Sequence, residues 1–151
     1  MPNPKKPRTP CLSCGKEPFG ANYKYCSNRC QFAYQNKVVI ERWKAGDVSG
    51  LSKLGLVTTT VKRYLREKFA NRCCLCGWSE INPYTGIAPL VADHIDGNWR
   101  NNREDNLRLL CPNCDSLMAT YAGANKGRGR PNRRVSKRAL EAQAMVRSKK
   151  A

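Results

Sequence analysis

The sequence predicts a small α+β protein that is held together by zinc, and three observations support this prediction. The chain has 151 residues, about the length of one domain. Apolar residues recur at helical spacing before residue 70 and form short strand-like runs after residue 87. Eight of the nine cysteines form four closely spaced pairs: Cys11 and Cys14, Cys26 and Cys30, Cys73 and Cys76, Cys111 and Cys114. Because a turn that carries two thiolates supplies half of a tetrahedral zinc site, we expect two four-cysteine sites.

The chain is strongly basic. It has 28 Lys and Arg against 11 Asp and Glu, a formal net charge of +17, which two cysteine-bound zinc ions would reduce to about +13. This charge favours nucleic acid as the partner, and a membrane surface is the weaker alternative because the basic stretches lack a broad apolar face. The sequence shows no membrane-spanning run and no signal peptide. We therefore expect an intracellular protein without a membrane partner, whose cysteines bind metal rather than form disulfides.

The N-terminal part is expected to be a zinc knuckle followed by a helix. Residues 1–10 are rich in proline and lysine and are predicted to be a disordered basic lead-in. Residues 11–46 form the knuckle and the helix, which Ser27 can cap and which runs to about Ala45 before Gly46 ends it. The apolar stripe of this helix is predicted to consist of Phe32, Val39 and Trp43.

A glycine-rich linker at residues 47–57 is expected to lead into a second helix. Thr58 to Thr60 can cap this helix, which is predicted to span roughly Val61 to Ala70. Its apolar stripe is Val61, Leu65 and Phe69, and its lysines and arginines lie on the opposite side.

Two short strands and a third helix are predicted in the second half. Residues 87–95 are apolar and β-branched, at least beyond Pro89, and residues 107–110 form the other strand. The segment between them, DGNWRNNRED, is too rich in Asn, Asp and Gly to be regular. We expect the third helix at about residues 115–122, after the Cys111 and Cys114 turn.

The only histidine of the chain is His94, which follows Asp93 near the end of a predicted strand. Taken alone, such a histidine is as often a structural residue as a functional one. Here the string DHIDGNWRNNREDNLRLLCPNC resembles the HNH endonuclease family, especially the small free-standing enzymes of phage genomes. The resemblance covers Cys73 to about Arg130 specifically, and extends more loosely to the N-terminal knuckle. It implies a ββα-metal HNH core within residues 58–125.

The resemblance also implies roles for four residues. His94 would be the general base that takes a proton from the attacking water, and Asp93 would be the first metal ligand. Asn106 would brace the loop and so orient the histidine. Asp115 stands where the family usually has His and sometimes Asn. Either the site is degenerate, or Asp115 is a second ligand; two carboxylates suit Mg²⁺ or Mn²⁺.

The zinc ions are expected to be structural. Cys73, Cys76, Cys111 and Cys114 would clamp the two ends of the core, since four cysteine ligands leave no open position for water. A quartet that uses Cys74 in place of Cys73 has a less usual spacing. Cys11, Cys14, Cys26 and Cys30 would form the second site, with a role in DNA contact or in docking another protein.

Basic residues near the motif are the candidate DNA contacts, and individually each is as well explained as a solvated charge. They are Arg63, Arg66, Arg100, Arg103, Lys126, Arg128 and Arg130. Residues 126–151 form a basic tail with room for one short helix around residues 136–146.

These observations predict a metal-dependent HNH DNA endonuclease or nickase that acts in a bacterial or phage-infected cell, with the oligomeric state left open. The alternative is a non-catalytic zinc-knuckle DNA-binding or packaging-accessory protein with a degenerate site. An RNA-binding zinc protein is disfavoured, because no aromatic stacking motif accompanies the basic residues.

Overall fold

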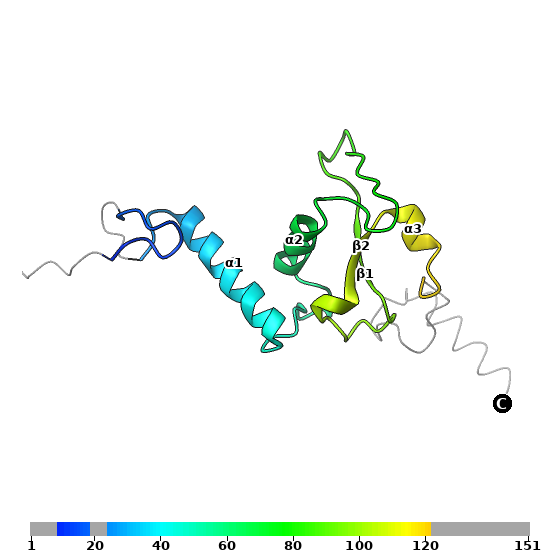
Figure 1. Cartoon of the computed structure of the whole chain (residues 1–151), viewed down its shortest axis with the longest axis horizontal. Coiled ribbons are helices and arrows are strands. Elements are labelled where there is room, and N and C mark those ends of the chain that lie inside the picture. Colours follow the sequence, from blue (N-terminus) through cyan, green and yellow to red (C-terminus); the bar gives the residue numbers. More distant parts are fainter. Residues whose placement is uncertain (1–8, 19–23, 122–151) are drawn as a thin grey trace, which may run out of the picture.

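The computed structural model describes residues 9–18 and 24–121 (Figure 1). Within them the elements follow in the order α1 (Asn28–Ala45), α2 (Thr59–Lys68), β1 (Val91–His94), a short 3₁₀ helix (Glu104–Asn106), β2 (Leu107–Leu110) and α3 (Pro112–Ser116). The structure is therefore a small α+β fold, as the sequence predicted. Most of the predicted lead-in and the whole basic tail, including the short helix predicted at residues 136–146, lie outside the described residues.

Helix α1 has the predicted ends. The Ser27 side chain accepts a hydrogen bond from the backbone N–H of Cys30 at its start, and Gly46 ends it with a left-handed φ of 85°. Of the predicted apolar stripe, only Trp43 is buried, at 4% exposed, whereas Phe32 is 64% exposed and Val39 is 41% exposed. In Figure 1, α1 runs from the N-terminal knuckle to the rest of the fold, which it contacts through Asn36, Ile40 and Trp43 rather than through Phe32 and Val39.

Helix α2 confirms the second predicted helix, displaced by two residues at each end. Thr58 caps it by accepting a hydrogen bond from the N–H of Val61. Val61 and Leu65 are fully buried, and Phe69 packs against the same core. The predicted stripe is therefore the face that α2 turns to the core.

The sheet has two antiparallel strands. Strand β2 lies at the predicted residues, but β1 begins at Val91, so the prediction of a strand over residues 87–95 was too long. Pro89 lacks the N–H that a ladder needs, and the N–H of Leu90 turns back to the carbonyl of Ala88 at 2.8 Å. The register pairs Val91 with Leu110.

The third helix lies earlier than predicted. The sequence favoured a helix at about residues 115–122, whereas α3 ends at Ser116 and residue 122 is outside the described residues. Pro112 fits the first helical position because its missing N–H needs no partner there. Cys111 caps the helix by accepting a hydrogen bond from the N–H of Cys114 through its sulfur. The turn between Cys111 and Cys114, which the sequence placed before the helix, is thus the first turn of α3.

The two faces of the sheet bury different sets of residues. One face carries the larger core, in which Leu107 and Leu109 pack against the helices α1 and α2. The partners from these helices and the preceding segment are Trp43, Val57, Val61 and Leu65. The other face carries Leu110 with Cys73 and Cys111. The predicted linker contributes Val57 to the larger core and forms a bridge between Leu51 and Val57.

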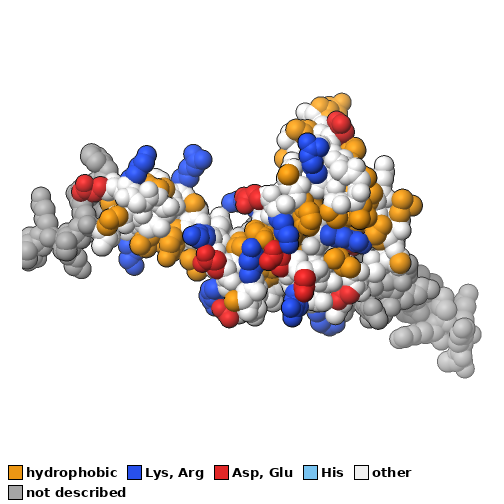
Figure 2. Space-filling model, in the orientation of Figure 1, with side chains coloured by type: hydrophobic (Ala, Val, Ile, Leu, Met, Phe, Trp, Pro, Cys, Tyr) orange, Lys and Arg blue, Asp and Glu red, His pale blue; other side chains and the backbone are white. Residues whose placement is uncertain are grey.

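No helix among the described residues is both long and apolar enough to cross a membrane. Figure 2 shows lysine and arginine side chains spread along this side of the molecule, from α1 across the core, rather than gathered in one patch.

Candidate active site and cysteine clusters

Asp93 and His94 lie on opposite faces of the sheet. Neighbouring residues of a strand alternate in direction, and residues paired across an antiparallel ladder share a face. Asp93 pairs with Arg108, and His94 pairs with Leu107, which belongs to the larger core. The histidine therefore faces the helices α1 and α2, and the aspartate faces α3.

Asp93 interacts with one positively charged residue, Arg108, and one negatively charged residue, Asp115. Its Oδ2 is 2.7 Å from Nε of Arg108, and the two side chains are 13% and 19% exposed. Burial raises the pKa of Asp115, and the negative charge of Asp93 raises it further, while Arg108 partly offsets both effects. The structure thus brings together the two carboxylates that the sequence predicted as metal ligands, and adds Arg108, which the sequence reasoning missed.

His94 is held by an asparagine other than the predicted one. It is 8% exposed, and its Nε2 is 2.9 Å from Oδ1 of Asn102. Asn102 is itself buried, and its amide nitrogen donates to the carbonyls of Trp99 and Arg100 at 3.0 and 3.1 Å. The indole N–H of Trp43 donates to the backbone carbonyl of Asn102 at 2.7 Å. These bonds fix the side chain and the backbone of Asn102 beside the ring.

Asn106 braces the loop that precedes it. Its Nδ2 donates to Oδ1 of Asp96 at 2.9 Å and to the carbonyl of Asn101 at 2.7 Å. Its Oδ1 accepts from the N–H of Asp96 at 3.1 Å. The side chain therefore contacts the loop, as the sequence suggested, while the direct contact with His94 belongs to Asn102. The loop is rich in asparagine, but no local pattern shows which asparagine reaches the ring.

The C-terminal cysteine cluster fits a zinc ion. The sulfurs of Cys73, Cys76, Cys111 and Cys114 all lie within 4.8 Å of one another. Those of Cys76 and Cys111 are 3.7 Å apart; the S–S separation in a tetrahedral zinc site with bonds of about 2.3 Å is about 3.8 Å. Cys74 is exposed and lies outside this group, which agrees with the predicted choice of Cys73.

The protonation of this cluster also suits a metal site. Burial raises the pKa of Cys73, but backbone hydrogen bonds from Cys76, Cys111 and Leu75 outweigh it and bring the pKa to about 6. The sulfurs of Cys76 and Cys111 raise the pKa of Cys114 to about 12. The thiolate of Cys73 is therefore stabilised, while the raised pKa of Cys114 favours a thiol whose proton a bound cation would displace.

The N-terminal cluster has the same form. Cys11, Cys14, Cys26 and Cys30 place their sulfurs within 4.8 Å of one another. The sulfur of Cys26 is 3.5 Å from that of Cys14 and 3.3 Å from that of Cys30. Both four-cysteine clusters could hold zinc.

The candidate DNA contacts have different surroundings. Arg66 donates to Oδ1 of Asn71 at 2.7 Å and to the carbonyl of Ala88 at 3.1 Å, so its guanidinium holds the fold together. Arg100 is exposed, with its guanidinium over the Trp99 ring at 4.6 Å. The exposed Arg103 is 3.4 Å from Asp105. Lys126, Arg128 and Arg130 lie outside the described residues.

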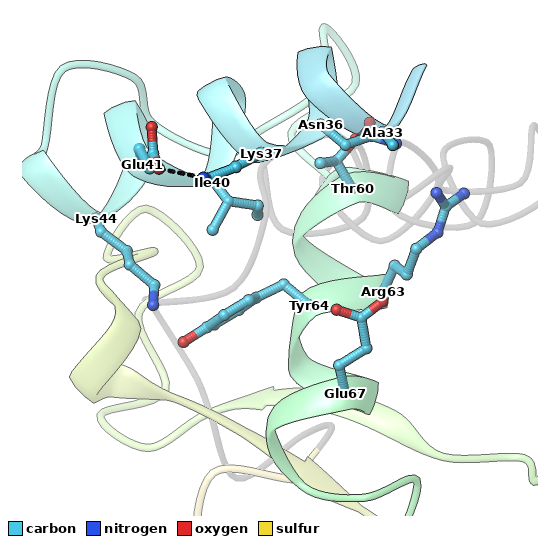
Figure 3. Close-up of a pocket in the computed structure, with 10 residues that line it drawn as sticks. All are labelled: Ala33, Asn36, Lys37, Ile40, Glu41, Lys44, Thr60, Arg63, Tyr64 and Glu67. Carbon is cyan, nitrogen blue, oxygen red and sulfur yellow. Dashed lines mark hydrogen bonds and ion pairs between the residues drawn. The ribbon is translucent and has the colours of Figure 1, made fainter. Parts of the chain in front are cut away.

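Arg63 is exposed beside an open groove between α1 and α2, with a volume of about 490 Å³ (Figure 3). Lys37, Lys44 and Arg63 line the groove together with Glu41 and Glu67. Because the lining carries both signs of charge, the groove has no clear preference for an anion.

The chain resembles a phage endonuclease over part of its length. A segment of 40 residues is 60% identical to "H-N-H endonuclease F-TflIV" of Escherichia phage T5. The segment covers 26% of this chain and 18% of that protein. No family model matches the chain. No solved structure matches it significantly. The shared segment supports an endonuclease of the HNH type at the level of the family.

Proposed function

We propose that this chain is a metal-dependent DNA endonuclease or nickase of the HNH type, with its ββα-metal core in residues 58–125. The observation that carries the proposal is the segment of 60% identity to a phage HNH endonuclease. The position of Asp93 and His94 at the end of β1, with Asp115 on α3 beside Asp93, is consistent with it.

The donor set at this position fits a hard divalent cation. Asp93 and Asp115 are close enough for the charge of one to raise the pKa of the other, and both lie on the α3 face of the sheet. Carboxylate oxygens are the ligands that Mg²⁺ and Mn²⁺ prefer, so these two residues would hold the ion. When bound, such an ion would stabilise the negative charge that develops on the phosphate and on the leaving 3′ oxygen.

His94 would act as the general base of the reaction. In its neutral form the imidazole would accept a proton from the water that attacks the phosphorus. Burial and the contact with Asn102 hold the ring in one orientation. Asn106 stabilises the loop between the strands and so acts on the site indirectly.

DNA is the proposed substrate. The exposed Arg63, Arg100 and Arg103 would contact phosphates, whereas the guanidinium of Arg66 is engaged in hydrogen bonds within the fold. The tail residues Lys126, Arg128 and Arg130 would add affinity without sequence preference. Two zinc ions in the cysteine clusters would be structural, and the N-terminal knuckle would contact DNA or a protein partner.

Cleavage of supercoiled plasmid tests the proposal. The zinc-loaded protein is incubated with plasmid in Mg²⁺, in Mn²⁺ and without added metal, and the products are separated on a gel. We expect nicked or linear DNA only with added metal. His94→Ala is expected to lower the rate by about 10²–10⁴-fold while DNA binding and zinc content remain, because no other histidine can replace it. An inactive wild type in both metals, or a fully active His94→Ala variant, would contradict the proposal.

One observation favours a second candidate function, that of a DNA-binding protein that does not cleave. Asp93 is already neutralised by Arg108, and a cation must compete with that ion pair. Plasmid retardation without cleavage under all metal conditions would support this candidate.

A further inference from the structure

We infer that Asn102 is the positioning residue of His94, and that its carboxamide oxygen keeps the imidazole proton on Nε2 and leaves Nδ1 as the basic nitrogen. The placement of the proton follows from the contacts alone. Its consequence for DNA cleavage rests on the proposed function.

The orientation of the Asn102 side chain is fixed by its other partners. The amide nitrogen donates to the carbonyls of Trp99 and Arg100, at 3.0 and 3.1 Å. If the carboxamide were turned over, its oxygen would face these two carbonyl oxygens, and none of the three can donate a hydrogen. The oxygen of Asn102 must therefore face the histidine.

The orientation of Asn102 determines the tautomer of the ring. Oδ1 of Asn102 lies 2.9 Å from Nε2 of His94 and can only accept a hydrogen bond. A neutral ring with its proton on Nδ1 would direct the lone pair of Nε2 at this oxygen, and two acceptors at that distance repel each other. With the proton on Nε2 the bond forms, and the lone pair of the ring lies on Nδ1.

The position of Asn102 is itself set by the core. Trp43, at the end of α1, is 4% exposed and donates its indole N–H to the Asn102 carbonyl at 2.7 Å. Asn102 is 5% exposed, so water cannot easily replace either bond. Asn102, the loop residue that contacts His94, is thus hydrogen-bonded to the C-terminal end of α1.

Nuclear magnetic resonance tests this inference directly, because the chain has one histidine and its ring nitrogens give unambiguous signals. In ¹⁵N-labelled, zinc-loaded protein without DNA, we expect a protonated Nε2 and an unprotonated Nδ1 at a pH where the ring is neutral. We also expect the Nε2 proton to exchange slowly with solvent. A proton on Nδ1 in the wild type would overturn the inference, whatever the activity of the protein.

Two variants separate the specific contact from general loosening of the loop. Asn102→Ala is expected to make the Nε2 proton exchange rapidly and to lower cleavage by about 10–100-fold, as removal of a partner that orients a functional histidine commonly does. Asn101→Ala is the matched control, because its side chain bonds Oδ2 of Asp96 at 2.7 Å instead of the ring. Asn101→Ala should keep slow exchange at Nε2.

Asn102→Ser is the second variant, for the case that Asn102→Ala fails to fold. Serine keeps a polar group at this position, but its side chain is too short to reach the ring. We expect the same loss of slow exchange at Nε2 and of cleavage activity. Unchanged exchange in both Asn102 variants would overturn the inference. An inactive wild type with its proton on Nε2 would support the inference on proton placement while contradicting the nuclease proposal, so the two failures are distinguishable.

Discussion

Arg108 and Asp93 form an ion pair across the two strands, with Nε of the arginine 2.7 Å from Oδ2 of the aspartate. Neither side chain is more than 19% exposed, so solvent screens the pair weakly. Nη2 of Arg108 also lies 2.9 Å from the sulfur of Met118, which follows α3. The guanidinium therefore occupies one carboxylate oxygen of the residue that we propose as the first metal ligand.

Removal of the Arg108 charge is expected to strengthen cation binding. Arg108→Gln should tighten the affinity for Mn²⁺ roughly tenfold, because the ion no longer competes with a positive charge at Asp93. Electron paramagnetic resonance of free Mn²⁺, in zinc-loaded protein without DNA, measures this affinity. Arg42→Gln changes the same charge on the exposed surface of α1 and should have little effect. Equal affinities in Arg108→Gln and in wild type would show that no cation binds against Asp93.

The C-terminal cysteine cluster predicts a sharp difference between two cysteines that lie two residues apart. Cys76→Ser is expected to remove zinc from the C-terminal cluster and to unfold much of the core, because a structural zinc typically contributes ~10–16 kcal/mol of apparent binding free energy. Cys74→Ser should keep both zinc ions, since this exposed residue lies outside the cluster. Elemental analysis and thermal unfolding measure the two effects. Loss of zinc in Cys74→Ser would mean that the ligand set is wrong.

Glu104 predicts a dependence of stability on pH. The hydrogen bond from Lys68 and then that from Tyr64 lower the pKa of its carboxyl group. Since the folded-state pKa lies below the unfolded value of about 4.3, the carboxylate stabilises the fold fully above that value. The stabilisation is lost as the pH falls through the lower, folded-state pKa.

Glu104→Gln should therefore destabilise the protein by about 1–2 kcal/mol near neutral pH, the usual worth of hydrogen bonds to a charged group. The difference from wild type should hold down to about pH 4.3 and narrow only below that value. Chemical denaturation at several pH values measures it, and Glu67→Gln, an exposed position on α2, is the matched control. A difference that grows with acidification would contradict the assignment.

The parts of the fold that the sequence predicted well depend on local chemistry. Ser27 and Gly46 mark the ends of α1 because capping needs only residues that are neighbours in the chain. The cysteine quartets were predicted because pair spacing reflects the geometry of a turn. Strand β2 was predicted because its short apolar run, between a polar loop and a cysteine turn, satisfies a local pattern.

The parts that were missed depend on which segments meet in space. Phe32 and Val39 have helical spacing but are 64% and 41% exposed, because α1 contacts the rest of the fold through other residues, namely Asn36, Ile40 and Trp43. The start of α3 was placed too late because Cys111 was read as a metal ligand alone, while it also caps the helix. Asn102 was overlooked because its contacts with His94 and Trp43 join residues that are separated along the chain.

Asp115 distinguishes a working cation site from a degenerate one. Burial and the charge of Asp93 raise the pKa of Asp115. In the absence of a cation, the ionised Asp115 carboxylate therefore lowers the stability of the folded protein. A raised folded-state pKa means that this cost is absent at low pH, grows as the pH rises above the unfolded value of about 3.9, and is complete above the folded-state value. Asp115→Asn should therefore stabilise the zinc-loaded protein by up to about 1 kcal/mol near neutral pH, when neither Mg²⁺ nor Mn²⁺ is present.

The same substitution should weaken Mn²⁺ binding and reduce plasmid cleavage if Asp115 is a ligand. Asp115→Ala should lose activity as well, whereas Asp115→His should retain some of it with altered metal preference, since imidazole favours softer divalent ions. Thermal unfolding, Mn²⁺ titration and the plasmid assay measure the three effects on the same proteins. Stabilisation with unchanged Mn²⁺ affinity would exclude Asp115 as a ligand and leave the role of His94 untouched. Cleavage that appears only in Asp115→His would identify the natural chain as a degenerate HNH protein. Histidine is the residue that the family usually has at this position, and its return would then restore the activity.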